Sequence, residues 1–284
     1  MGMIAFVAYI EFFAANPLIR TSVFKNMSAA ILSVSTVIYG IIMWAILYCM
    51  PLYFEAVKGF GPILAGVAMF SWTFTVAPAS VATGIAIAVT GKYLWANRAG
   101  WFLTTLGMGL LIVLKPDTST VSWIFLNLVG GVGTGILCTA MALAVQASAT
   151  AKDQAYAANM FSFFRASGQT LGVAIGGVIF QNQMRKKMRM FPLLADLAAE
   201  YSHNAAELVE IIKEMPAGEM REQLRESYTD ALKYIWIVML VLSAVALLGS
   251  WFIKAYDLNG AMDTERGFVD KDKVGDVEKE QPVM

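Results

Sequence analysis

The residues that could do chemistry are few and lie far apart. The chain has 284 residues, with one histidine, His203, and two cysteines, Cys49 and Cys138. No metal-ligand spacing, phosphate-binding loop or nucleophile motif accompanies them. The one histidine is expected in a polar surface loop, where it cannot support a catalytic triad, and cysteines within apolar stretches are typical of small packing residues. The sequence therefore predicts no catalytic residue, no metal site and no cofactor, and it indicates that the chain is not an enzyme.

Arg165 is the one charged residue inside an otherwise apolar stretch, between Phe161 and Gly168. An arginine in the middle of a membrane helix costs at least about 2.5–3.5 kcal/mol on insertion scales, so it must face a partner or water. Asp153, in the connection before this stretch, is the nearest acid. We expect a structural ion pair between the two, and contact with a substrate or a gating network is the alternative.

Uncharged polar and aromatic side chains also occur within the apolar runs. Amide groups there can bond across helices or line a cavity, and an indole can stack on an apolar or aromatic ligand. The alternative for the tryptophans is an interfacial belt or core packing. The candidates for a substrate path are Trp44, Trp72, Asn127, Gln146, Asn159 and Gln169.

The carboxylates lie away from the middle of the apolar runs. A proton-coupled carrier needs an ionisable group within the membrane that binds and releases protons. Glu11, Glu55 and Asp117 all fall at the ends of runs. Glu55 is the one candidate for such a group, and an interfacial role is the alternative for it.

The elements that must position these residues are membrane helices. Hydrophobic types make up 58% of the chain and charged types 15%, and the mean hydropathy is +0.61, whereas soluble domains carry about 45–50% apolar and about 25% charged residues. About 20 apolar residues cross a bilayer, and its lack of water forces them into helices. The fold class expected is an all-α membrane protein with a six-helix bundle, its spans near 28–50, 62–89, 97–115, 121–147, 156–182 and 233–255.

The regions outside the spans differ in composition. Residues 1–27 are expected to be the end of a preceding helix and a cytoplasmic linker, and 28–182 hold the first five spans. Residues 183–232 combine both charges with apolar positions at helical spacing, which predicts an extracellular loop with amphipathic helices on the membrane surface. Residues 233–256 form the sixth span, and 257–284 a disordered cytoplasmic tail. Positive charges in the short loops give this orientation, and a net charge of zero excludes a nucleic-acid footprint.

Glycines recur at short intervals in two of the spans. Small residues spaced four apart allow two helices to approach closely. Static packing is one interpretation, and a sliding surface between helices that rock during alternating access is the other. The packing candidates are Gly131, Gly135, Gly168, Gly172 and Gly176.

Several longer motifs carry a family resemblance. They are NPLIRTSVFKN at 16–26, LYFEAVKG at 52–59, APAS at 77–80, GWFLTTLG at 100–107 and FFRASGQTLGVAIGGVIFQN at 163–182. With these, the chain resembles the C-terminal half of fungal major facilitator superfamily multidrug transporters with fourteen spans, the drug:proton antiporter class. The resemblance runs from about Asn16 to Gly267.

A shorter pattern concerns a cytoplasmic loop of that superfamily, Gly-x-x-x-Asp-Arg-x-Gly-Arg-Lys. Gly84, Gly91 and Lys92 match it between the second and third spans. Ala88 and Val89 replace its acid and its arginine. The resemblance thus implies that the turn is kept while the charged gating latch is weakened.

The resemblance implies transport of small amphipathic compounds, as drug or toxin efflux coupled to protons, in the plasma membrane. The implied partners are the lipid bilayer, a small-molecule substrate, and a missing N-terminal half or a second copy of the chain. The proton-coupling acids are expected in that missing half, because the chain is expected to be truncated. The alternative is a non-transporting membrane fragment or pseudo-transporter.

Overall fold

The computed structural model describes residues 27–149, 153–192, 194–201 and 205–256. Every element in these ranges is a helix. The expectations for residues 1–26 and 257–284, and those for Glu11 and His203, lie outside the described residues.

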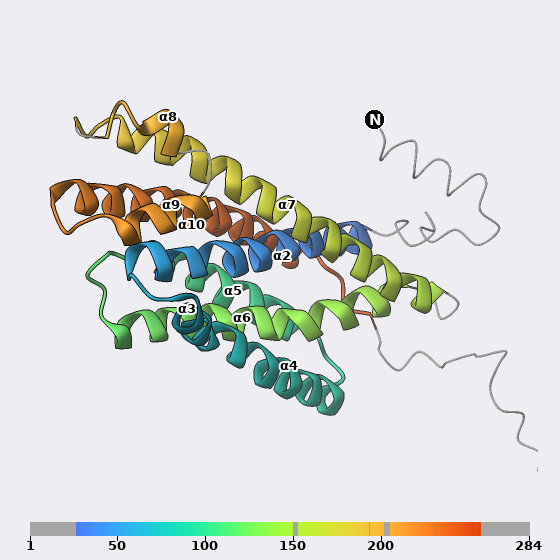
Figure 1. Cartoon of the computed structure of the whole chain (residues 1–284). Helices are drawn as coiled ribbons and strands as arrows, with labels where there is room; N and C mark the ends of the chain where they lie inside the picture. Colours follow the sequence, from blue (N-terminus) through green and yellow to red (C-terminus); the bar gives the residue numbers. More distant parts are fainter. Residues whose placement is uncertain (1–26, 150–152, 193, 202–204, 257–284) are drawn as a thin grey trace, which may run out of the picture.

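Six long helices form the bundle, and successive ones run in alternating directions along it (Figure 1). They are α2 (Met27–Leu52), α4 (Phe70–Thr90), α5 (Leu94–Leu111), α6 (Thr120–Ala147), α7 (Gln154–Met188) and α10 (Glu219–Ser250). A π-helical turn, η2 (Tyr53–Val57), continues α2, and α3 (Pro62–Ala68) leads into α4. Two short helices, α8 (Ala198–Tyr201) and α9 (Ala205–Glu214), lie between α7 and α10.

Five segments among the described residues are long and apolar enough to cross a membrane. The helix α5, which covers most of the predicted third span, is not among them. It has 18 residues, includes Arg98, and packs against α6 and α10. The five segments are Met27–Val57, Pro62–Thr90, Thr120–Ala147, Gln154–Met188 and Glu219–Ser250.

Local sequence explains where several helices begin and end. Gly91 ends α4 in the left-handed conformation, with φ of +66°, which glycine adopts without the steric cost of a Cβ. Ser119 caps α6 by accepting a hydrogen bond from the backbone N–H of Ser122. Pro62 occupies the first turn of α3, where its missing N–H breaks no helical bond.

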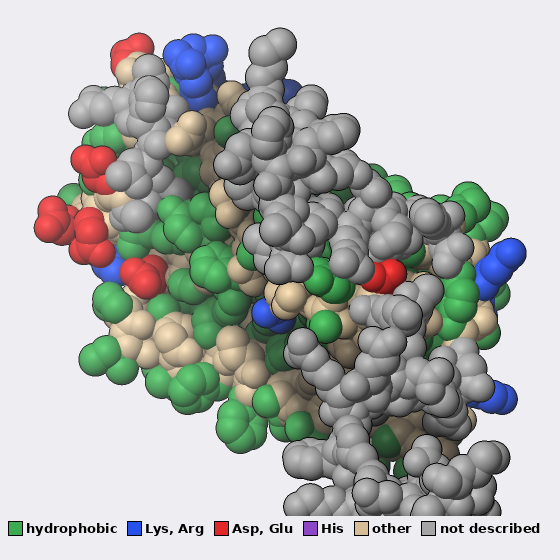
Figure 2. All heavy atoms as spheres, turned by 90° about the vertical axis from the view of Figure 1, so that its right-hand side faces the viewer, with side chains coloured by type: hydrophobic (Ala, Val, Ile, Leu, Met, Phe, Trp, Pro, Cys, Tyr) green, Lys and Arg blue, Asp and Glu red, His purple; other side chains and the backbone are tan. Residues whose placement is uncertain are grey.

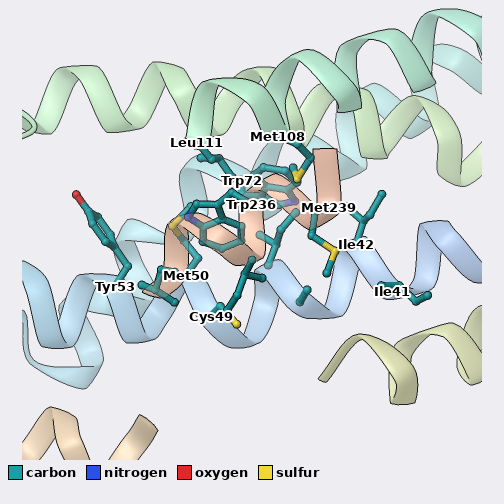
Figure 3. Close-up of a cluster of buried hydrophobic side chains, with 14 of the residues drawn as sticks. Ile41, Ile42, Cys49, Met50, Tyr53, Trp72, Met108, Leu111, Trp236 and Met239 are labelled. Atoms are coloured by element: carbon teal, nitrogen blue, oxygen red, sulfur yellow. The ribbon is translucent and has the colours of Figure 1, made fainter. Parts of the chain in front are cut away.

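Large apolar side chains from four helices meet in the core (Figure 3). Trp72 of α4 and Trp236 of α10 are 0% and 1% exposed. Met50 of α2, Met108 of α5 and Met239 of α10 surround them (Figure 3) and are fully buried. Methionine fills irregular gaps between rigid rings. This cluster therefore packs α2, α4, α5 and α10 against one another.

The helices α2 and α7 touch backbone to backbone at a seam of glycines. A methyl group added to Gly168 would lie 2.2 Å from the carbonyl oxygen of Val37, and one added to Gly172 would lie 2.4 Å from that of Ile41. From the other side, a methyl on Gly40 would lie 2.3 Å from the carbonyl oxygen of Arg165. No side chain fits at these positions. Farther along the same face, Gly176 packs near Cys49.

The helix α6 has two glycine faces. Gly131 and Gly135 face α4, where added methyl groups would lie 2.2 Å from the hydroxyl oxygen of Thr75 and 2.6 Å from the carbonyl oxygen of Val76. Gly133 faces α5, where a methyl would lie 2.5 Å from the backbone nitrogen of Thr104. The helix α6 therefore packs closely against α4 on one face and against α5 on another.

The region after α7 differs from its prediction. The helix α7 extends to Met188 and α10 begins at Glu219, so the connection between the long helices is shorter than 183–232. The apolar face of α9, formed by Leu208, Val209 and Ile212, is 1% exposed at each residue. The protein itself buries this face, because the end of the bundle offers an apolar surface. This corrects the expectation that the face lies on the membrane surface.

Other apolar side chains remain on the outside of the bundle. Figure 2 shows hydrophobic side chains over the lower part of the described surface. A large set lies along α3 and α4: Ile63, Leu64, Val67, Phe70, Phe74, Val81, Ile85 and Val89, all at least half exposed. A continuous apolar surface of this kind is what a helix presents to lipid or to a second bundle. With the five apolar helices, it identifies a multi-pass membrane protein.

We predict that Gly168→Ala destabilises the bundle, because its methyl group forces the backbones of α2 and α7 apart. Overpacking of this kind costs about 1–3 kcal/mol. The readout is the apparent melting temperature in detergent. The control is Gly177→Ala on the same helix, where no atom lies within 4 Å of the added methyl. Equal melting temperatures for the two variants would contradict the seam.

Candidate functional site

The structure does not gather the six predicted path residues at one place. Trp72 and Asn127 are 0% and 1% exposed inside the bundle. Trp44 is 41% exposed on α2, and Asn159 is exposed on α7. The remaining two, Gln146 on α6 and Gln169 on α7, are half-buried. The set therefore divides into an interior group and a surface group.

The interior group carries polar atoms without protein partners. The indole ring of Trp72 lies over Gly130 of α6, where an added methyl would be 2.2 Å from the ring. Asn127 precedes Gly130 by about one turn on the same helix. Neither the Trp72 Nε1 nor either amide atom of Asn127 has a hydrogen-bond partner among the described residues. A buried polar group left unpaired costs about 1–3 kcal/mol, so these atoms lower the stability of the core.

A second buried polar row follows α5. Asn97, Trp101 and Thr104 are each 0% exposed. Both amide atoms of Asn97, the Nε1 of Trp101 and the hydroxyl of Thr104 have no partner among the described residues. Asn97 and Thr104 were not among the residues predicted from the sequence. Their spacing with Trp101 puts all three on one face of a helix, and that spacing was the signal that could have found them.

Arg165 does not pair with Asp153 as predicted. Asp153 is the N-cap residue directly before α7, and Arg165 lies twelve positions later on that continuous helix. A helix rises 1.5 Å per residue, so about 18 Å of axis separates them, more than the two side chains span. The guanidinium carbon of Arg165 instead lies 5.7 Å from the ring centroid of Phe161, within cation–π range. Asp153 has an interaction elsewhere.

The predicted gating loop joins the segment that follows α10. Lys92 is exposed and borders a cavity of about 190 Å³ with Tyr93, Trp95 and Tyr256. The hydroxyl of Tyr93 accepts a hydrogen bond from the backbone N–H of Tyr256 at 3.1 Å. The backbone N–H of Lys254 donates to the hydroxyl of Ser28 on α2 at 3.1 Å. These two hydrogen bonds thus connect α2 and the start of α5 to the segment after α10 at this end of the bundle.

Gly84 and Gly91 of that loop pattern have different surroundings. A methyl on Gly84 would lie 3.5 Å from the side chain of Thr139, an ordinary contact. Nearby, the hydroxyls of Ser80 and Thr139 are 2.6 Å apart and link α4 to α6. An added methyl on Gly91 would have no atom within 4 Å, so glycine is favoured there by the left-handed backbone conformation that ends α4.

The opposite end of the bundle is centred on the π turn that ends α2. The hydroxyl of Tyr53 donates to the carbonyl oxygen of Lys115 at 2.8 Å. The Nζ of Lys58 donates to the carbonyl oxygens of Pro116 and Thr118 at 2.5 and 2.6 Å. Burial lowers the pKa of Lys58 below its ordinary value, and the charge of nearby Asp117 opposes that shift. These bonds fix the connection between α5 and α6 to the end of α2.

Comparison with known proteins supplies what the geometry alone does not. No family model matches the chain. Over 279 residues, 98% of the chain, it is 73% identical to a protein named MFS transporter L2 from Phoma sp.. The chain is a homologue of fungal MFS transporters. It is also 30% identical to a protein named Efflux pump FUS6 from Gibberella moniliformis and to one named Acurin A biosynthesis cluster MFS-type transporter from Aspergillus aculeatus, over 94% of the chain in each case.

This homology confirms the resemblance and the fold class. The relatives are named as MFS transporters and efflux pumps and not as enzymes, and the helical bundle is of the MFS kind. The chain spans about half the length of the curated relatives it matches, 47% of the Phoma protein and 49% of the other two.

We predict that Asn127→Leu raises the apparent melting temperature of the bundle, because it removes two unpaired amide atoms from the core. The gain corresponds to about 1–3 kcal/mol. Asn159→Leu, on the exposed side of α7, is the matched control and is expected to change the melting temperature little. A clear loss of stability in Asn127→Leu would show that Asn127 has a partner and would contradict this account.

Proposed function

We propose that this chain is the C-terminal bundle of a fungal MFS carrier that exports small amphipathic compounds as drug or toxin efflux. The observation that carries the proposal is the 73% identity to a named MFS transporter across 98% of the chain. The relatives at 30% identity, one of them named an efflux pump, support the direction of transport. Coverage of about half of each relative supports an N-terminal bundle as the partner of this chain.

The substrate path of such a carrier lies between the two bundles near the middle of the bilayer. The exposed residues of the surface group, Trp44 and Asn159, are the candidates for contact with substrate, together with the half-buried Gln169. An indole face suits an apolar or aromatic part of a compound, and the amides suit its polar groups. Trp72 and Asn127 are not proposed to contact the substrate, because their side chains are buried inside the bundle.

Proton coupling and a plasma-membrane location belong to the proposal. Among the described residues, Glu55 lies in η2, and Asp117 and Asp230 of α10 both border one charged pocket. All three are near the same end of the bundle. We propose that the carboxylate that carries protons at mid-membrane belongs to the N-terminal bundle.

We predict that efflux of a fluorescent drug analogue from transporter-deficient yeast requires this chain and an N-terminal bundle together. Three strains are compared at matched membrane expression: the chain alone, the gene extended upstream, and the extended gene with a collapsed proton gradient. Efflux is expected only from the second strain. Efflux from the chain alone would indicate a working half-transporter that pairs with a second copy. Lack of efflux in all three would favour a non-transporting protein and contradict the proposal.

We predict that Trp44→Leu in the extended carrier weakens apparent affinity for an aromatic substrate by about 10-fold, the loss of about 1–1.5 kcal/mol of stacking. Concentration-dependent efflux gives this value. The control is Trp95→Leu, a tryptophan of similar exposure, 45% against 41%, at the start of α5. Equal affinities for both variants would remove Trp44 from the path.

A further inference from the structure

The end of α2 is a single π turn, Tyr53–Val57. The backbone N–H of Lys58 bonds to the carbonyl oxygen of Tyr53 at 3.3 Å, five residues earlier. The next bond, from Phe60 to Phe54 at 3.0 Å, spans six residues. These wide turns leave carbonyl oxygens free for other partners. Single π turns, most of which lie inside α-helices, are frequent at functional sites.

Two basic side chains from distant parts of the sequence hold this turn. The guanidinium group of Arg225, on α10, donates to the carbonyl oxygen of Val57 from Nε at 3.0 Å and from Nη2 at 2.5 Å. The negative C-terminal end of the α2 dipole also stabilises a cation at this position. The Nζ of Lys213, on α9, lies 3.3 Å from the carboxylate of Glu55 and 3.1 Å from that of Glu210.

The Glu55–Lys213 ion pair is only partly sheltered from solvent. The exposed fractions of the Lys213 and Glu55 side chains are 22% and 20%. Burial disfavours the charged form of Lys213, but the hydrogen bonds to Glu210 and Glu55 outweigh it, and the pKa of Lys213 lies above its ordinary value. A cavity of about 160 Å³ lies beside the pair, bordered by Lys58, Ile212 and Arg225 as well. The contact between α9 and the π turn is therefore charged and incompletely filled.

The helix α9 contacts the rest of the protein in two ways: through the charged contact at Lys213 and through a tightly packed apolar face. Leu208, Val209 and Ile212 are 1% exposed and hold the helix against the bundle. Opening of the charged contact breaks an ion pair at the edge of the protein, where such pairs contribute little. Opening of the apolar contact exposes three large side chains at once. The charged contact is therefore the part that can open and close.

We propose that Glu55, Lys213 and Arg225 form a latch that fastens the end of α2 to the loop helix α9 and to α10, and that this latch opens and closes during transport. The role in transport rests on the proposed function, whereas the fastening of α9 does not. The latch can transmit movement because α2 contacts α7 backbone to backbone at Gly168 and Gly172. A shift at the end of α2 is thus carried along both helices.

The fastening is tested without any transport assay. Ala56→Cys is placed in the π turn, where Ala56 is 1% exposed and borders the cavity beside the ion pair. Cys49 and Cys138 are replaced by alanine in the same chain, and labelling of the new cysteine by a membrane-impermeant maleimide is timed in sealed and in permeabilised vesicles. Adding Glu55→Gln is expected to speed labelling by about threefold or more, as loss of an ion pair permits. The charge exchange E55K with K213E is expected to recover part of the protection. Unchanged labelling in Glu55→Gln would overturn the latch, whether or not the carrier transports.

The movement is tested by locking the latch in the extended carrier. Glu55→Cys and Lys213→Cys are joined by a short bis-maleimide with a reducible spacer, and efflux is measured before linking, after linking and after reduction. Efflux is expected to stop on linking and to return on reduction. In the control carrier, the same reagent joins Glu210→Cys to Lys213→Cys. This control also lacks Lys213, but its link connects two residues of α9 and leaves the π turn free. Efflux from the linked 55–213 carrier at the rate of the linked control would overturn a moving latch. Lack of efflux from every carrier, including the unlinked one, would count against the proposed function, and the labelling result would then decide the latch alone.

Discussion

The close approach of helix backbones at glycines is the contact on which the rest of this bundle depends. Lipid chains are as apolar as leucine, so membrane helices associate through packing and hydrogen bonds rather than through exclusion of water. The seam at Gly40, Gly168 and Gly172 brings α2 onto α7, and the two glycine faces of α6 bring in α4 and α5. The fully buried Trp72 fits only because Gly130 leaves room for its ring. These contacts place the helices that carry Trp72, Asn127 and Arg165.

The two ends of the bundle are fastened in different ways. At one end the hydroxyls of Tyr93 and Ser28 accept hydrogen bonds from backbone N–H groups of the segment after α10. At the other end side-chain charges dominate, with Lys58, Lys213 and Arg225 around the π turn of α2 and a Lys187–Asp230 pair between α7 and α10. Backbone bonds to a well-packed tyrosine favour a fixed structure. Partly exposed ion pairs contribute little stability each, which is consistent with the proposed opening of the latch at this end.

The sequence predicted what depends on period and composition. The apolar runs located the long helices, including α5, and the four-residue glycine spacing indicated which faces come close, because both patterns act within one helix. The pairing of Arg165 with Asp153 was wrong because Asp153 was expected in a loop that could fold back, whereas it is the N-cap of the continuous helix that carries Arg165. The sequence also did not show which helix meets which. Burial of Ile212 and the partners of Glu55 also depend on contacts between distant segments. The polar row at Asn97 could have been found from its spacing, whereas the π turn gave no recognisable pattern.

We propose that this bundle is one of two halves that together form a carrier. The most direct measurement is co-purification of the affinity-tagged chain with a separately expressed N-terminal bundle, followed by mass determination of the complex in detergent. We expect a stable one-to-one complex that survives size-exclusion chromatography. A chain that purifies alone, or only with copies of itself, in the presence of excess N-terminal bundle would contradict it.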